Sequence, residues 1–156
     1  MDNIQFEDFL KVLKAEEVPF ATTINDLYSE SGCKVEIKAS ASGFTVSYLS
    51  GKTKKTLANF ICRKTGLKIR ITPPKPFDCN DLLATLPDNM KKDIIRAHNC
   101  QRLSDANVCN PRCPMGYAFM LDGENYGKCR SMAFMFSVTE ENLPYILAFI
   151  QKELSV

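Results

Sequence analysis

The chain has 156 residues, enough for one domain with a sizeable core. Apolar residues make up 45% of it and charged residues 24%, a balance that excludes a globally disordered chain. No apolar run approaches the roughly 20 residues of a membrane-spanning helix. The acidic N-terminal segment lacks the basic and apolar regions of a signal peptide, so we expect a cytoplasmic protein.

Two helices are predicted before the first strand. Apolar residues at helical spacing predict an amphipathic helix over 4–15, with Asn3 as its cap. Gly32 is a natural helix end, which predicts a second helix near 24–31, with Pro19 in the loop before it. The apolar residues of the first helix are Phe6, Phe9, Leu10 and Leu13.

The next segment alternates between apolar and polar residues, as strands with one buried face do. Residues 33–39 and 44–48 form one predicted hairpin, and residues 56–62 and 67–72 form a second. Two adjacent hairpins predict a four-stranded antiparallel sheet. A helix over 54–62 is the alternative for the third strand.

Prolines end the predicted sheet, and helices are expected again beyond them. A short helix is predicted near 79–85 and another at 87–97, followed by a small hairpin over 117–130. Leucine and isoleucine spacing then predicts a C-terminal helix, with Thr139 or Asn142 as its cap.

Together these elements predict an α+β fold. A four-stranded antiparallel sheet would pack against helices, with a C-terminal cysteine-rich, zinc-knuckle-like subdomain. Residues 1–97 would form the sheet domain. Residues 98–156 would form the cysteine-rich hairpin and the C-terminal helix, packed on the first segment as one unit.

The seven cysteines are unevenly distributed, because four of them fall between residues 100 and 129. In a reducing compartment, clustered cysteines hold metal more often than they form disulfides. Four thiolates satisfy a tetrahedral structural zinc, and Pro111, Pro114 and Gly116 supply the turns that a zinc knuckle needs. The predicted ligands are Cys100, Cys109, Cys113 and Cys129.

The spacing of this cluster leaves alternatives open. Cys109 and Cys113 are separated by three residues, whereas the commonest knuckles have two. Reduced thiols without metal, an iron–sulfur cluster, a redox disulfide pair and a site that uses His98 are the alternatives. Four flanking cations would lower the thiol pKa values and hold the negative sulfurs together. They are Arg102, Arg112, Lys128 and Arg130.

Charge is segregated along the chain, although the net charge is only +2. The segment from Ile37 to Phe77 contains nine basic residues and no acidic residue, which favours an anionic partner such as nucleic acid or another polyanion. The alternative is that the basic segment faces the acidic remainder of the chain. The predicted polyanion-binding residues are Lys34, Lys38, Lys52, Lys54, Lys55, Arg63, Lys64, Lys68 and Arg70.

Common catalytic motifs are missing from the sequence. There is no Gly-rich phosphate loop, no His-Glu-x-x-His zinc motif and no Gly-x-Ser-x-Gly nucleophile turn. Cys62 lies beside Arg63 and Lys64, which makes it a candidate activated thiolate, but a buried structural cysteine is the competing interpretation.

The run Cys109-Asn-Pro-Arg-Cys113-Pro-Met-Gly-Tyr117, with Lys128-Cys129-Arg130, resembles a small bacterial family of cysteine-rich proteins without an established activity. Gly32-Cys33 and Arg63-Lys64-x-Gly66-Leu67 resemble the same proteins. The resemblance implies a bacterial cytosolic protein and transfers no site residue. We therefore expect a small zinc-stabilised binding or regulatory protein that takes up a polyanion through its basic sheet. The alternative is a thiol or redox enzyme that uses reactive cysteines.

Overall fold

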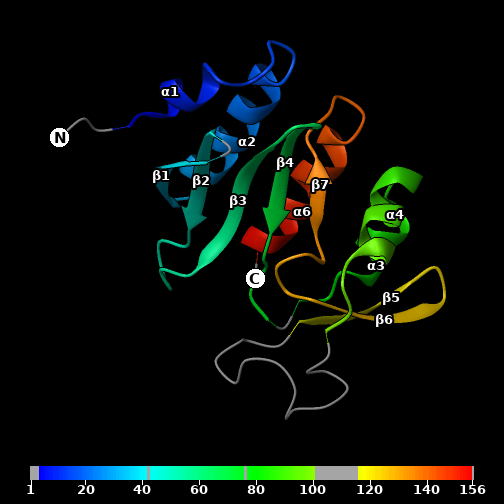
Figure 1. The fold of residues 1–156 in the computed structure, drawn as a ribbon. Helices are drawn as coiled ribbons and strands as arrows, with labels where there is room; N and C mark the ends of the chain where they lie inside the picture. Colours follow the sequence, from blue (N-terminus) through cyan, green and yellow to red (C-terminus); the bar gives the residue numbers. More distant parts are fainter. Residues whose placement is uncertain (1–3, 42, 76, 101–115, 156) are drawn as a thin grey trace.

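The computed structural model describes residues 4–41, 43–75, 77–100 and 116–155. Its main sheet has five antiparallel strands in the order β1-β2-β3-β4-β7, and two further strands form a separate hairpin (Figure 1). The main strands are β1 (Lys34–Ser40), β2 (Gly43–Leu49), β3 (Thr56–Arg63), β4 (Gly66–Ile71) and β7 (Met135–Ser137). The hairpin strands are β5 (Tyr117–Leu121) and β6 (Glu124–Lys128).

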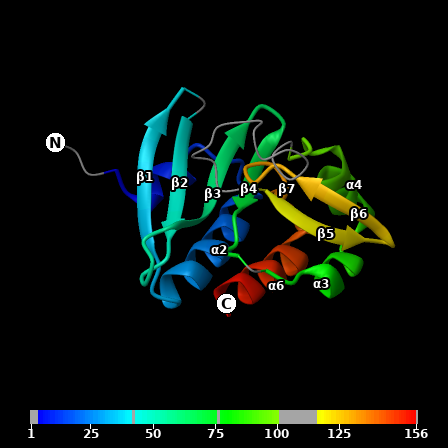
Figure 2. The same cartoon turned by 90° about the horizontal axis from the view of Figure 1, so that it is seen from below.

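The helices are short, and the two longest of those described cover one face of the main sheet. Helices α2 and α6 lie side by side beneath the strands, and α4 stands beyond β7 at one edge (Figure 2). Within the described ranges, no helix combines the length and the apolar composition that a membrane crossing requires. The helices are α1 (Phe6–Leu10), α2 (Val18–Glu30), α3 (Asn80–Ala84), α4 (Asp88–Arg96) and α6 (Leu143–Leu154).

The core lies between the sheet and these helices. Tyr28 of α2 stacks on Tyr48 of β2 with ring centroids 4.6 Å apart. Further along, Phe134 is fully buried and its ring packs against Tyr117, Phe119 and Phe149. Aromatic packing therefore joins the main sheet, the small hairpin and α6 into one core.

The α+β class and the four predicted strands are confirmed, and the structure adds a fifth strand. Residues 56–63 form β3, so the helix considered for 54–62 was wrong. The strand β7 was not predicted. It has only three residues, and it exists because Ile69 and Phe136 pair across the long sequence gap that separates β4 from β7.

The boundaries of the first two helices differ from the predictions. The first begins at Phe6, with Gln5 rather than Asn3 at its N-cap. The first helix ends at Leu10 rather than at residue 15, although Leu13 still packs against the core. The second begins at Val18 rather than near residue 24. Pro19 stands in its first turn, where a missing N–H costs nothing, rather than in a loop. Asn142 stands at the N-cap position of α6, but its side chain makes no capping hydrogen bond, and its own N–H donates to the Thr139 hydroxyl at 3.2 Å.

Candidate functional site

The main sheet presents a polar face on the side opposite to α2 and α6. Apolar residues such as Val46, Phe60 and Ile69 point into the core, and the residues between them point outward. We call the outward side the open face. Its residues are Lys34, Glu36, Lys38, Thr45, Ser47, Asn59, Ile61, Arg63, Lys68, Arg70, Met135 and Ser137.

Strand register arranges these side chains in rows across the sheet. One row runs from Glu36 through Ser47 and Asn59 to Arg70, and the Asn59 amide donates a hydrogen bond to the Ser47 hydroxyl at 2.7 Å. The neighbouring row runs from Lys38 on β1 to Ser137 on β7. Its residues are Lys38, Thr45, Ile61, Lys68 and Ser137. The second row therefore has a lysine at each side, whereas the first has Glu36 at its β1 side and Arg70 at its β4 side.

The nine predicted polyanion-binding residues fall into three groups. The open face carries Lys34, Lys38, Arg63, Lys68 and Arg70. The turn between β2 and β3 carries Lys52, Lys54 and Lys55. Lys64 lies in the turn between β3 and β4, at the other end of these strands. The fold therefore gathers five of the cations on one surface and places the other four at its two ends.

Acidic residues offset part of this positive charge. Lys34 forms an ion pair with Glu36 at 3.6 Å on its own strand. Burial raises the pKa of Asp93 of α4, and the nearby Lys68 offsets part of this rise by favouring the ionised carboxylate. Burial lowers the pKa of Arg70, as does the nearby Arg63.

The cysteine region begins where α4 ends. Residues 98–100 run antiparallel to residues 127–129, through a bridge between Asn99 and Lys128. The Cys100 N–H donates to the Gly127 carbonyl at 2.9 Å, and the Cys129 N–H donates to the His98 carbonyl at 2.7 Å. Because Cys100 and Cys129 are each one step from the bridging pair, their side chains lie on the same side of this ladder.

A third segment approaches the Cys100 thiol. The Gly116 N–H donates a hydrogen bond to Cys100 Sγ, with 3.2 Å between nitrogen and sulfur. A side chain at position 116 would collide with the Lys128 carbonyl oxygen and crowd the Cys100 Cβ, so only glycine allows this approach. Backbone N–H donors to sulfur stabilise the thiolate form that binds metal.

The structure tests the predicted zinc site only in part. Cys109 and Cys113, together with the flanking Arg102 and Arg112, lie outside the described residues. Within the part of the chain that the structure describes, no group of three or more His, Cys, Asp or Glu side chains could hold a metal. The described residues thus bring two of the four predicted ligands to one ladder.

Of the expected flanking cations that the structure describes, Lys128 does not serve the cysteines. Lys128 is almost fully buried and turns away from the thiols, because its ammonium group donates to the Ile95 and Ala97 carbonyls at the end of α4. Arg130 lies beside the Tyr117 hydroxyl. Among the described residues, Arg70 lies near enough to Cys129 for the cysteine to act on it electrostatically.

Arg70 also joins the two predicted sites. Its Nε atom is buried and has no hydrogen-bond partner among the described residues. It stands on the open face and close to Cys129. This contact could not be predicted from local sequence patterns, because only the tertiary fold brings β4 to the segment after β6.

The three scattered cysteines have properties opposite to those of an activated thiol. Burial raises the pKa of Cys33, of Cys62 and of Cys79, the last to about 12. For Cys62 this raised pKa favours the structural cysteine over the candidate activated thiolate. Adjacent residues of a strand point to opposite faces, so Arg63 lies on the open face while Cys62 faces inward.

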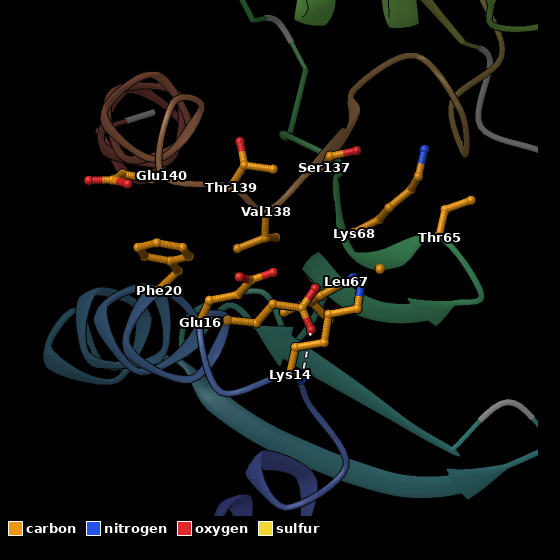
Figure 3. Close-up of a pocket in the computed structure, with 12 residues that line it drawn as sticks. Lys14, Glu16, Phe20, Thr65, Leu67, Lys68, Ser137, Val138, Thr139 and Glu140 are labelled. Carbon is orange, nitrogen blue, oxygen red and sulfur yellow. Dashed lines mark hydrogen bonds between the residues drawn. The ribbon is translucent and has the colours of Figure 1, made fainter.

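A cavity of about 280 Å³ adjoins one end of the open face, between the segment before α2, the turn before β4 and the end of β7 (Figure 3). Glu17 is buried in its wall and accepts hydrogen bonds from the Lys14 and Leu67 N–H groups, at 3.1 and 2.8 Å. Lys68 lies in its wall and on the open face. Its other lining residues are Glu16, Phe20, Thr65, Gly66, Ser137, Val138, Thr139 and Glu140.

Two lysines and three glutamates line this cavity, so its charge does not favour an anion. The sequence did not indicate it, because its walls come from three separated segments. No protein-family model, curated protein or solved structure matches this chain.

Proposed function

We propose that the protein binds a polyanion, with nucleic acid as the leading class, on the open face. The observation that carries the proposal is that β1, β3 and β4 direct five cations to one surface of the sheet. Strands lie about 4.8 Å apart, so cations on β1 and β4 are roughly 14 Å apart across the sheet. This spacing suits several phosphates of one strand.

The composition of the open face indicates the mode of binding. Its residues, as defined above, include no aromatic side chain on which bases could stack. The hydroxyl and amide groups of Thr45, Ser47 and Asn59 lie between the cations and are suited to phosphate and sugar oxygens. Binding should therefore depend weakly on base sequence and strongly on salt.

Fluorescence anisotropy with a labelled oligonucleotide of about 16 nucleotides tests this proposal. The double variant Arg63→Gln/Lys68→Gln removes two open-face charges. Lys11→Gln/Lys152→Gln is the matched control, because both lysines are exposed at helices, α1 and α6, that pack on the other side of the sheet. Loss of two phosphate contacts should lower the slope of log affinity against log salt by about 1.4.

The control should keep the wild-type slope. Equal slopes for the two double variants would contradict binding on the open face. So would the absence of wild-type binding at low salt. Replacing the oligonucleotide by heparin then distinguishes nucleic acid from other polyanions.

We also propose that Cys100, Cys109, Cys113 and Cys129 bind a structural zinc ion. The shared ladder of Cys100 and Cys129, and the Gly116 N–H bond to Cys100 Sγ, support it. Four thiolates around Zn²⁺ carry net negative charge. The guanidinium group of Arg70 would help to neutralise it, because its buried Nε atom has no hydrogen-bond partner among the described residues. When bound, zinc would supply cross-linking rather than chemistry, because four cysteines leave no open position.

Elemental analysis of protein purified without chelator tests the zinc proposal. We expect one zinc per chain, with Cys113→Ser and Cys129→Ser lowering both metal content and melting temperature. Cys33→Ser is the control, because Cys33 is a half-buried thiol of the sheet region. Unchanged zinc content in the first two variants would contradict the assignment.

A further inference from the structure

The strand β1 is the terminal strand of the main sheet. It has seven residues and pairs only with β2, so its other edge pairs with no strand of the described chain (Figure 2). The edge at the opposite end, β7, has three residues and α4 beside it. A strand edge of this length that no described strand occupies presents backbone donors and acceptors to which another strand can add.

We propose that β1 pairs antiparallel with β1 of a second copy of this chain, centred on Ile37. Ile37 is the middle residue of β1, so this register pairs all seven residues of both strands. Glu36 of each copy then lies directly opposite Lys38 of the other, and Ile37 lies opposite Ile37 on the inner side.

Charge complementarity selects this register. Directly opposed unlike charges stabilise a strand pair, and like charges destabilise it. A register centred on Glu36 would oppose Lys34 to Lys38 twice and Glu36 to itself. A parallel pairing in register would oppose every charge to its own kind.

Two other registers are less complete. Centring on Val35 also opposes Lys34 to Glu36, but it pairs only residues 34–36 of the strand. Shifting the pairing of the two strands by one residue places the charged side chains opposite apolar ones such as Val35 and Ile37, so no ion pair forms. The helices of the two copies would then lie on opposite faces of the joined sheet. Of these registers, only the one centred on Ile37 pairs the full strand and places Glu36 of each copy opposite Lys38 of the other.

The consequence is a ten-stranded sheet whose two open faces lie on the same side. The inference does not rest on polyanion binding, because it concerns the outer edge of β1 rather than the open face. A single pair of strands is a small interface, so the dimer should be weak and in exchange with monomer.

Sedimentation equilibrium over roughly 10 µM to 1 mM protein tests the inference. The wild-type chain should form a concentration-dependent dimer. Glu36→Lys and Lys38→Glu alone should each weaken it by about tenfold or more, because each turns two attractive pairs into repulsive ones. The double variant Glu36→Lys/Lys38→Glu should restore it, since the pairs are then reversed rather than lost.

Arg63→Gln/Lys68→Gln should dimerise like the wild type, which separates this test from that of polyanion binding. Melting temperatures near that of the wild type confirm that each variant is folded. A wild-type chain that stays monomeric throughout the range would overturn the proposal. So would a double charge reversal that associates no better than either single variant.

Discussion

A buried carboxyl group controls how stability depends on pH. Glu153 near the end of α6 is 1% exposed, and its Oε1 atom accepts a hydrogen bond from the Tyr28 hydroxyl at 2.8 Å. Its Oε2 atom has no partner among the described residues. Burial raises the pKa of Glu153 from 4.5 to about 8, and the bond from Tyr28 offsets only part of this rise.

The sign of the effect follows from the two pKa values. Below about pH 4.5 the carboxyl group is neutral in both the folded and the unfolded chain, so its ionisation does not lower the free energy of unfolding. As the pH rises towards 8, the unfolded chain ionises and the folded chain does not, so stability falls. At about 1.4 kcal/mol per pH unit, the loss between pH 5 and 7.5 is about 3 kcal/mol.

Glu153→Gln removes this titration and keeps an oxygen to accept the Tyr28 bond. We expect it to match the wild type near pH 5 and to exceed its stability at pH 7.5 by about 3 kcal/mol. Urea denaturation at a series of pH values measures the difference. Glu124→Gln, at an exposed position of β6, should keep the wild-type pH dependence. Parallel stability curves for Glu153→Gln and the wild type would refute the argument.

Three further substitutions test the packing around the cysteine ladder and the core by chemical denaturation. Lys128→Met removes the donor to the Ile95 and Ala97 carbonyls and should lower the free energy of unfolding by about 1–3 kcal/mol. Unchanged stability would show that these hydrogen bonds contribute little. Gly116→Ala forces the backbone away from the Lys128 carbonyl and should lower the free energy of unfolding by about 1–3 kcal/mol. Wild-type stability would show that this close approach is not needed. Phe134→Ala leaves a cavity at the centre of the aromatic cluster and should lower the free energy of unfolding by about 3–5 kcal/mol. A loss below about 1 kcal/mol would show that the cluster does not stabilise the packing of the β5–β6 hairpin.

The local pattern of the sequence was sufficient for the four consecutive strands. Residues such as Val46 and Phe60 alternate with polar neighbours, and a period of two residues specifies both the strand and the face that it buries. The same alternation correctly placed Lys38 and Lys68 on one polar face, because neighbouring strands connected by short turns pair in register.

The tertiary structure alone decided the features that join distant segments. The strand β7 exists through its pairing with β4, and the charged environment of Arg70 depends on Cys129, which is far away in the sequence. Glu153 falls on the buried stripe of α6, where its spacing predicts only a position and not a charge state. The period of the sequence pattern indicates which face of an element a side chain lies on. Strand pairing, the free energy of burial and the pKa depend on the residues that pack against that side chain from other segments, and local spacing does not specify those residues.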